Sequence, residues 1–236
     1  MIIACWSGPR NISTALMRSW SSRKDTFVTD EPFYAYYLKE TKLKHPMYKD
    51  IINTYDSNYN EIVNYLTNVI PQNKKIWYQK HMAHHILDSR NIDWIANCKN
   101  CILLRNPKEV ISSFVRKNKL NSVEELGYSQ QYEIIKFLRK KNKPYIIIDS
   151  SELLKNPEKL LSIWCNKINI EFDKSMLKWA KGNHPNDGIW WESWYDNVIV
   201  TTGFQKYEIK DIAIESKYDS IYNESMKYYN YIKEAK

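Results

Sequence analysis

Apolar and polar positions follow two different spacings along this chain, and each spacing predicts its own kind of element. Short apolar runs predict five buried strands, at residues 2–6, 26–29, 75–79, 101–104 and 145–148. Elsewhere apolar residues recur every three or four positions, which predicts helices at residues 12–20, 33–38, 59–69, 92–97, 107–118, 121–142, 157–168 and 218–235. Apolar strands that alternate with helices are typical of a parallel sheet covered on both faces. The pattern therefore predicts an α/β fold, with a central parallel sheet flanked by helices in a single domain over residues 1–236.

Two stretches show neither the strand spacing nor the helix spacing. Residues 39–50 are polar and include Pro46, so we expect a loop that acts as a flap. Residues 172–207 carry four tryptophans, at positions 179, 190, 191 and 194, together with three glycines. We expect this aromatic region to close over a binding site as a lid that holds a base or an apolar acceptor. A packed part of the core would have the same composition.

The turn between the first strand and the first helix has the features of an anion site. Residues 7–11 read Ser-Gly-Pro-Arg-Asn, and the helix follows at once. Loop amides and the free N–H groups of a helix start point at one spot, and the helix dipole attracts an anion there. Ser13 and Thr14 can add hydroxyl donors, and Arg10 can add a full charge. The alternative is a simple helix cap, because Ser and Asn are favoured at helix starts.

Other candidate residues follow the remaining strands, where ligands bind in α/β sheets. Glu31 follows the second strand and is either a reactive carboxylate or a surface cap. Lys80 can neutralise a leaving oxygen and His81 can exchange protons near neutral pH, whereas His84 and His85 are expected to be structural. These histidines have no evident further ligand, so we expect no metal. Arg105 can bind a phosphate or form a buried salt bridge.

Composition narrows the class of protein. The chain has 35 Lys and Arg against 27 Asp and Glu, a net charge of +8, but the lysines are scattered and we expect no nucleic-acid partner. Four cysteines include a lone C-x-x-C at 98–101, which argues for reduced thiols rather than zinc. The chain opens straight into a strand, and no apolar run approaches the roughly 18 residues of a membrane span. We expect a cytoplasmic protein without a membrane span.

Two motifs together resemble the sulfotransferases that use 3′-phosphoadenosine 5′-phosphosulfate (PAPS). The sequence SGPRNISTALMRS, at residues 7–19, resembles the 5′-phosphosulfate loop of the cytosolic and Golgi-type enzymes, which is a strand, then P-[KR]-x-x-[ST]-[ST], then a helix. The sequence LLRNPKEVISSF, at residues 103–114, resembles their 3′-phosphate motif, R-[ND]-P-x-[DE]-x-x-x-S. The likeness runs from Met1 to about Phe114, with a weaker echo at residues 201–207, and it extends to bacterial sulfotransferase-like proteins.

The resemblance implies a P-loop architecture and assigns roles to individual residues. The 5′-phosphosulfate would be held by the loop and helix start, namely Gly8, Pro9, Arg10, Asn11, Ile12, Ser13 and Thr14. The 3′-phosphate would be held by Arg105 and Ser113, with further donors from Thr202, Gly203 and Lys206. Ala15 stands where many cytosolic members have an aromatic residue that stacks on adenine. The catalytic His of the cytosolic members follows a K-x-H pattern, whereas this chain reads Lys80-His81-Met82. In Golgi-type members a Glu early in the chain acts as the base. The resemblance therefore implies that the base is either His81 or Glu31.

These assignments predict the transfer of a sulfuryl group from PAPS to a hydroxyl or amine of a small-molecule acceptor, with PAP as the second product and no metal. PAPS carries about four negative charges, so its site needs cations at both ends. Arg10 and Lys80 would stabilise charge on the bridging oxygen. The alternatives are an ATP-dependent P-loop phosphotransferase, which the missing G-K-[ST] disfavours, and a non-catalytic nucleotide-binding module. The acceptor is not specified, and a homo-oligomer is left open.

Overall fold

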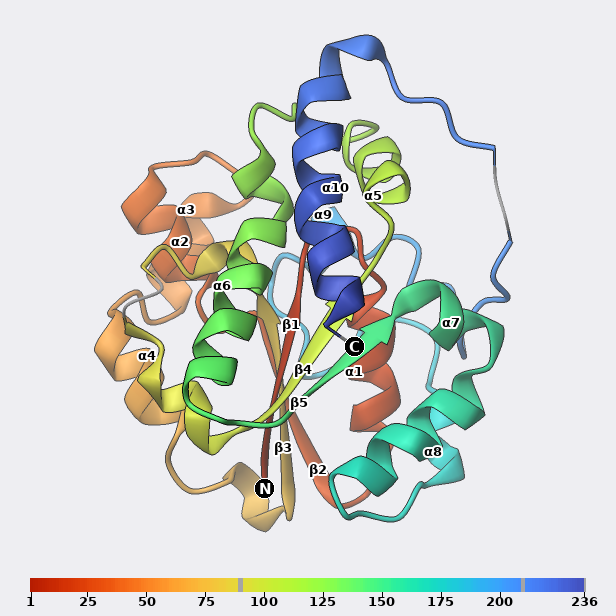
Figure 1. Cartoon of the computed structure of the whole chain (residues 1–236). Helices are drawn as coiled ribbons and strands as arrows, with labels where there is room; N and C mark the ends of the chain where they lie inside the picture. Colours follow the sequence, from red (N-terminus) through yellow and green to blue (C-terminus); the bar gives the residue numbers. More distant parts are fainter. Residues whose placement is uncertain (89–90, 209–210, 236) are drawn as a thin grey trace.

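The computed structural model describes residues 1–88, 91–208 and 211–235 (Figure 1). Its centre is a five-stranded sheet in the order β2-β3-β1-β4-β5, with every neighbouring pair parallel. The strands are β1 (Ile2–Ser7), β2 (Thr26–Asp30), β3 (Ile76–Met82), β4 (Lys99–Leu104) and β5 (Tyr145–Asp149). All five predicted strands are present, which confirms the α/β fold with a parallel sheet. β3 differs in one respect, because it continues beyond Gln79 and includes Lys80 and His81.

Helices cover both faces of the sheet, because side chains of each strand point alternately to the two sides. One face packs against α1 (Ser13–Ser21), α7 (Ser150–Lys155) and α8 (Pro157–Lys167), through Leu16, Trp20 and Trp164 among others. The other face packs against α4 (Tyr59–Leu66), α5 (Pro107–Phe114), α6 (Tyr128–Lys140) and α10 (Asp219–Glu234). None of the helices in the described ranges has the length and apolar character needed to cross a bilayer. The four cysteines are buried and free.

Two predicted elements are built differently from what the apolar spacing indicates. The polar stretch 39–50 was expected to be a loop, but α2 (Tyr34–Thr41) runs into it and α3 (Tyr48–Thr54) begins inside it. The helix expected over 121–142 is two pieces, a short 3-10 turn (Val123–Leu126) and then α6, separated by Gly127 at φ 77°. A left-handed glycine ends the first piece, and the predicted capping box of Ser122 and Glu125 begins it.

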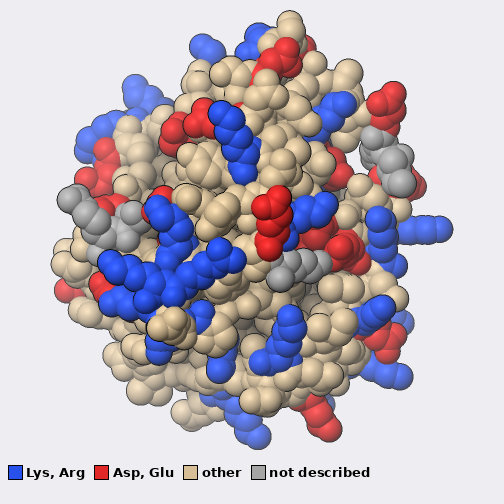
Figure 2. All heavy atoms as spheres, viewed as in Figure 1, with Lys and Arg blue, Asp and Glu red and all other residues tan. Residues whose placement is uncertain are grey.

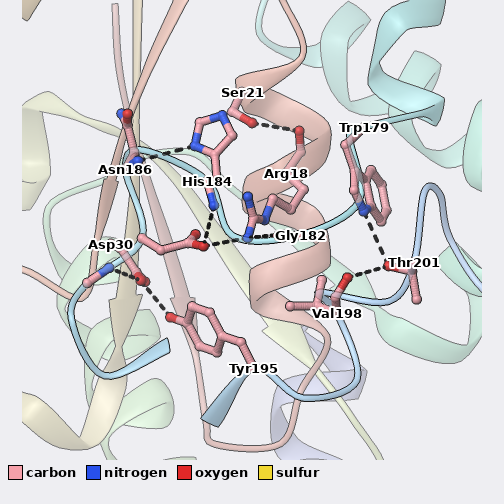
Figure 3. A network of polar contacts seen from close by, with 12 residues as sticks. Arg18, Ser21, Asp30, Trp179, Gly182, His184, Asn186, Tyr195, Val198 and Thr201 are labelled. Atoms are coloured by element: carbon pink, nitrogen blue, oxygen red, sulfur yellow. Dashed lines mark hydrogen bonds and ion pairs between the residues drawn. The ribbon is translucent and has the colours of Figure 1, made fainter. Parts of the chain in front are cut away.

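The aromatic region 172–207 is packed against the rest of the domain. Figure 3 shows Arg18 of α1 pointing into the loop that carries Gly182 and His184. The Arg18 guanidinium pairs with Asp187 at 2.5 Å, and both side chains are buried. Asn186 also donates from its side-chain amide to the Val28 carbonyl of β2 at 2.8 Å. These contacts make the region a wall that is fixed to α1 and β2.

Charged side chains are distributed unevenly over the surface. Figure 2 shows Lys and Arg interspersed with Asp and Glu over much of one face, and a denser basic group over the C-terminal part of α6. Lys136, Arg139 and Lys140 are exposed on that part of the helix. This group lies on α6 and contributes nothing to the cavity described next.

Candidate active site

A cavity of about 590 Å³ lies at the carboxyl ends of the strands. Its walls come from the loop after β1, the ends of β2 and β3, α5, and the aromatic region. Residues 9–15 form one side, Glu31 and Lys80 another, and Tyr195 and Phe204 belong to the aromatic wall. This is the edge of a parallel sheet where α/β proteins bind ligands. The sequence-based candidates Arg10, Ser13, Thr14, Glu31, Lys80, Arg105 and Ser113 all line it.

The loop after β1 presents backbone donors to this cavity. α1 begins at Ser13, no side chain of the described residues caps it, and its first turn carries no acidic residue. Asn11 does not act as the cap that the alternative interpretation requires, because its amide nitrogen donates to the Leu103 carbonyl at 2.6 Å. The start of α1 therefore has free N–H groups and an uncompensated positive dipole end. Gly8 lies behind the loop, where an added Cβ would come within 2.2 Å of the Leu126 carbonyl oxygen.

Two arginines and a serine meet beside this loop. The Arg10 guanidinium donates from Nε to the Ser113 hydroxyl at 3.0 Å, and Arg105 donates from Nη1 to the Arg10 carbonyl at 2.5 Å. Arg105 also pairs with Glu109 at 2.8 Å, so its charge is partly compensated. Burial and then the positive charges of Arg116 and Arg105 lower the pKa of Arg10. An anion bound between these cations would relieve that repulsion.

A second polar centre lies at the ends of β2 and β3. The buried Lys80 ammonium donates to Asp30 Oδ1 at 2.8 Å, to Glu31 Oε1 at 2.7 Å and to the Tyr195 hydroxyl at 2.7 Å. An ammonium group has three hydrogens, so these partners engage all of them. Burial raises the pKa of Glu31, the Lys80 charge opposes that effect, and the net direction is upward. Glu31 also has a left-handed backbone, at φ 42°.

His81 lies away from the cavity. Its side chain is on the opposite face of β3 from Lys80, where it stacks on Trp6 with ring centroids 4.3 Å apart. Its Nε2 contacts Gln79 Oε1 at 3.2 Å, and burial lowers its pKa to about 3. His84 and His85, expected to be structural, do line the cavity, and His85 stacks on Tyr34.

The last candidates, near residue 203, are spread out. Gly203 lines the main cavity, whereas Thr202 is exposed and is not among its lining residues. Lys206 borders an adjoining cavity of about 430 Å³, which Arg105 also lines. Among the described residues no group of His, Cys, Asp or Glu has a metal-binding arrangement.

Two buried residues of the site were missed from the sequence. Asp30 precedes the candidate Glu31 and occupies the same strand end, which is a usable signal. Tyr195 is 115 positions from Lys80, and nothing in the local sequence indicates that they meet.

Comparison with known proteins assigns the family. A family model described as a sulfotransferase domain matches residues 1–236. The chain belongs to the sulfotransferase family. The predicted family is thereby confirmed.

Solved structures share the fold of this sulfotransferase. The sulfotransferase domain from the curacin biosynthetic pathway superposes with a TM-score of 0.60 at 17% identity, over 94% of this chain and 96% of that one. A sulfotransferase from Alicyclobacillus acidocaldarius gives 0.57 at 9% identity, over 97% and 94% of the two chains. At these identities the likeness concerns the fold.

Two curated relatives from Arabidopsis thaliana have a different kind of name. Branched-chain-amino-acid aminotransferase-like protein 2 is 36% identical over 211 residues, which are 87% of this chain and 37% of that protein. Protein 1 of the same name is 36% identical over 205 residues, 86% of this chain and 36% of that protein. The sulfotransferase chain spans little more than a third of the length of these relatives, whose names refer to the whole proteins.

Proposed function

We propose that this sulfotransferase moves a sulfuryl group from PAPS to a hydroxyl or amine of a small-molecule acceptor. One observation carries the proposal: a single cavity joins the free N-terminus of α1 and the pair Arg10–Ser113 to the buried carboxylate of Glu31. The first group suits a polyanionic donor, and the second suits removal of a proton.

The donor would lie along the loop after β1. Free N–H groups at the start of α1, the hydroxyls of Ser13 and Thr14, and the Arg10 guanidinium would bind the 5′-phosphosulfate. Arg105 and Ser113 would bind the 3′-phosphate, which ATP does not have. Gly203 lines the same cavity as Arg105, and Lys206 lines the adjoining cavity that Arg105 also borders, so both would add donors around the same phosphate.

Glu31 would act as the base. The acceptor hydroxyl gives its proton to the Glu31 carboxylate as its oxygen bonds to sulfur. The bond from sulfur to the phosphate oxygen breaks, and the electron pair stays on that oxygen. Arg10 and the N–H groups of α1 stabilise the charge that develops there. We assign this role to Glu31 and not to His81, because the His81 imidazole is outside the cavity and its pKa of about 3 makes it a weak base.

Lys80 would act through Glu31. Its three hydrogens are already engaged by Asp30, Glu31 and Tyr195, so a direct bond to the leaving oxygen would require one of these bonds to break. Its charge opposes the effect of burial on the pKa of Glu31, since a nearby cation favours the carboxylate.

Calorimetric titration with three nucleotides tests the donor. Adenosine 3′,5′-bisphosphate, ATP with magnesium, and adenosine 5′-phosphosulfate are each titrated into the purified chain. We expect tight binding of the bisphosphate and at least tenfold weaker binding of the phosphosulfate that lacks a 3′-phosphate. Preference for ATP would favour a phosphotransferase instead. Binding of the bisphosphate without release of PAP from PAPS across a panel of phenols, alcohols and amines would favour a non-catalytic nucleotide-binding module.

A further inference from the structure

The buried centre around Lys80 contains a residue from the aromatic wall. The Tyr195 hydroxyl lies 2.7 Å from Lys80 Nζ and 2.6 Å from Asp30 Oδ2. A phenol has one hydrogen and lone pairs to accept with, so it accepts from the ammonium and donates to the carboxylate. Figure 3 shows Tyr195 and Asp30 pointing toward each other. Both are buried, at 5% and 6% exposure, so this hydroxyl has no free exchange with solvent.

The backbone of the same wall completes the centre. Gly188 donates its N–H to Asp30 Oδ2 at 3.0 Å, and Trp190 donates from Nε1 to the Tyr195 hydroxyl at 3.1 Å. A Cβ at position 188 would come within 2.1 Å of the Trp190 ring, so this close approach requires glycine. Asp30 thus accepts from Lys80, Tyr195 and Gly188. This is the saturation that a buried carboxylate needs.

We infer that Tyr195 and Asp30 are positioning residues, which hold the Lys80 ammonium beside Glu31 and, by opposite contributions of their own, set the ionisation of Glu31. The inference rests on the proposed function for the role of Glu31 as base. The physical relationship among the four side chains is independent of that role.

The charges facing Glu31 make opposite contributions. Lys80 reaches it from β3, Asp30 from β2, Tyr195 from the end of α9 (Trp191–Trp194) and Tyr34 from α2. Burial raises the pKa of Glu31, Lys80 lowers it, Asp30 raises it, and the nearby Tyr195 hydroxyl lowers it. Removal of the Tyr195 hydroxyl should therefore raise the pKa of Glu31. Removal of the Asp30 charge should lower it.

Carbon-13 NMR titration of the free protein, labelled at the side-chain carboxyl carbon of glutamate, tests this without any substrate. The Glu31 resonance is assigned from its loss in Glu31→Gln. We expect Tyr195→Phe to move its midpoint upward in pH by about 0.5 to 1 unit, and Asp30→Asn to move it downward by a similar amount. Tyr65→Phe, at a half-exposed tyrosine, is the matched control and should leave the midpoint unchanged. If both variants leave the midpoint in place, or move it in the same direction, the inference is overturned. If Asp30→Asn does not fold, the direction seen in Tyr195→Phe decides alone.

Turnover separates this inference from the proposed function. With an acceptor found in the panel, Tyr195→Phe should lower kcat about tenfold, leave KM for PAPS within about twofold, and shift the acid limb of the pH–rate profile upward. An NMR shift without a matching shift of the acid limb would support the positioning roles of Tyr195 and Asp30 and would contradict the role of Glu31 as the base. A residue that only supported the fold would change Tm and leave both titrations where they are.

Discussion

Arg10 and Ser113 are joined by a hydrogen bond of 3.0 Å from the guanidinium Nε to the hydroxyl, although they lie 103 positions apart. Arg10 belongs to the loop after β1, and Ser113 belongs to α5. The bond therefore connects the two stretches that the resemblance assigns to opposite ends of the same nucleotide. It also orients the guanidinium across the mouth of the loop before any ligand binds. We expect Ser113→Ala to weaken binding of adenosine 3′,5′-bisphosphate by about 1 kcal/mol, measured by calorimetry.

Arg105 should contribute more than Ser113. Arg105→Ala removes a permanent cation from the proposed 3′-phosphate site and should weaken bisphosphate binding by about 2–4 kcal/mol. Binding of adenosine 5′-phosphosulfate, which lacks the 3′-phosphate, should change much less. Arg139→Ala, at an exposed arginine of α6, is the control and should bind as the wild type does. Equal losses for both nucleotides would mean that Arg105 acts by holding the Arg10 carbonyl and not by binding the 3′-phosphate.

Loss of the Glu31 carboxylate should separate binding from turnover. Glu31→Gln keeps the shape of the side chain and removes the base, so kcat should fall by about 10²–10⁴ while bisphosphate affinity stays within about twofold. Glu40→Gln, at an exposed glutamate of α2, should behave as the wild type in both assays. Release of PAP by Glu31→Gln at an unchanged rate would remove this residue from the mechanism.

His81 should matter for stability alone. His81→Asn removes an imidazole that stacks on Trp6 in the core, and should lower the free energy of unfolding by about 1–3 kcal/mol. Its kcat, measured well below the melting temperature of the variant, should remain within about threefold of wild type. A loss of kcat comparable with that of Glu31→Gln would make His81 the base.

Buried histidines should make the fold acid-sensitive. Burial lowers the pKa of His81 and His84 to about 3, and that of His85 well below its ordinary value. The unfolded chain therefore binds protons below about pH 6.5 that the folded chain does not. Their contribution to stability is complete above that pH and is lost as the pH falls toward 3. Urea unfolding between pH 4.5 and 7.5 should show a free energy of unfolding that decreases as the pH falls below about 6.5. His84→Gln should reduce the slope of that decrease by about 1.4 kcal/mol per pH unit. An unaltered slope would mean that the folded protein also binds a proton at His84.

The pair Arg18–Asp187 should be needed to fix the aromatic wall. Arg18→Met leaves Asp187 buried without its cation and should destabilise the fold by about 3–5 kcal/mol, measured by urea unfolding. The double variant Arg18→Met/Asp187→Leu removes both charges and should recover part of that loss. If the double variant is as unstable as the sum of the single ones, the two side chains do not stabilise each other.

Much of this architecture could be predicted, because its strands and helices bury apolar side chains at regular spacings. The exceptions have physical causes. α3 buries only Ile51, so its sequence has almost no apolar period to detect. β3 continues through Lys80 because Asp30 on the neighbouring strand compensates the charge, and a single sequence does not show that pairing. In the site, motifs located Arg10, Arg105 and Ser113, since each motif is local. Tyr195 was missed because its partners Lys80 and Asp30 come from two strands far from it in the sequence.

Arg10 and Glu31 share one backbone feature, a φ in the left-handed region, at 57° and 42°. Side chains other than glycine are rarely found there, and each such residue costs the fold of order 1 kcal/mol or more. Replacement by glycine would relieve that backbone strain, but it would remove a proposed catalytic group at each position and, at position 31, a partner of the buried Lys80. Variants selected for heat resistance should therefore be screened by turnover as well as by melting temperature, because relief of this strain at either position removes a group that the proposed reaction uses.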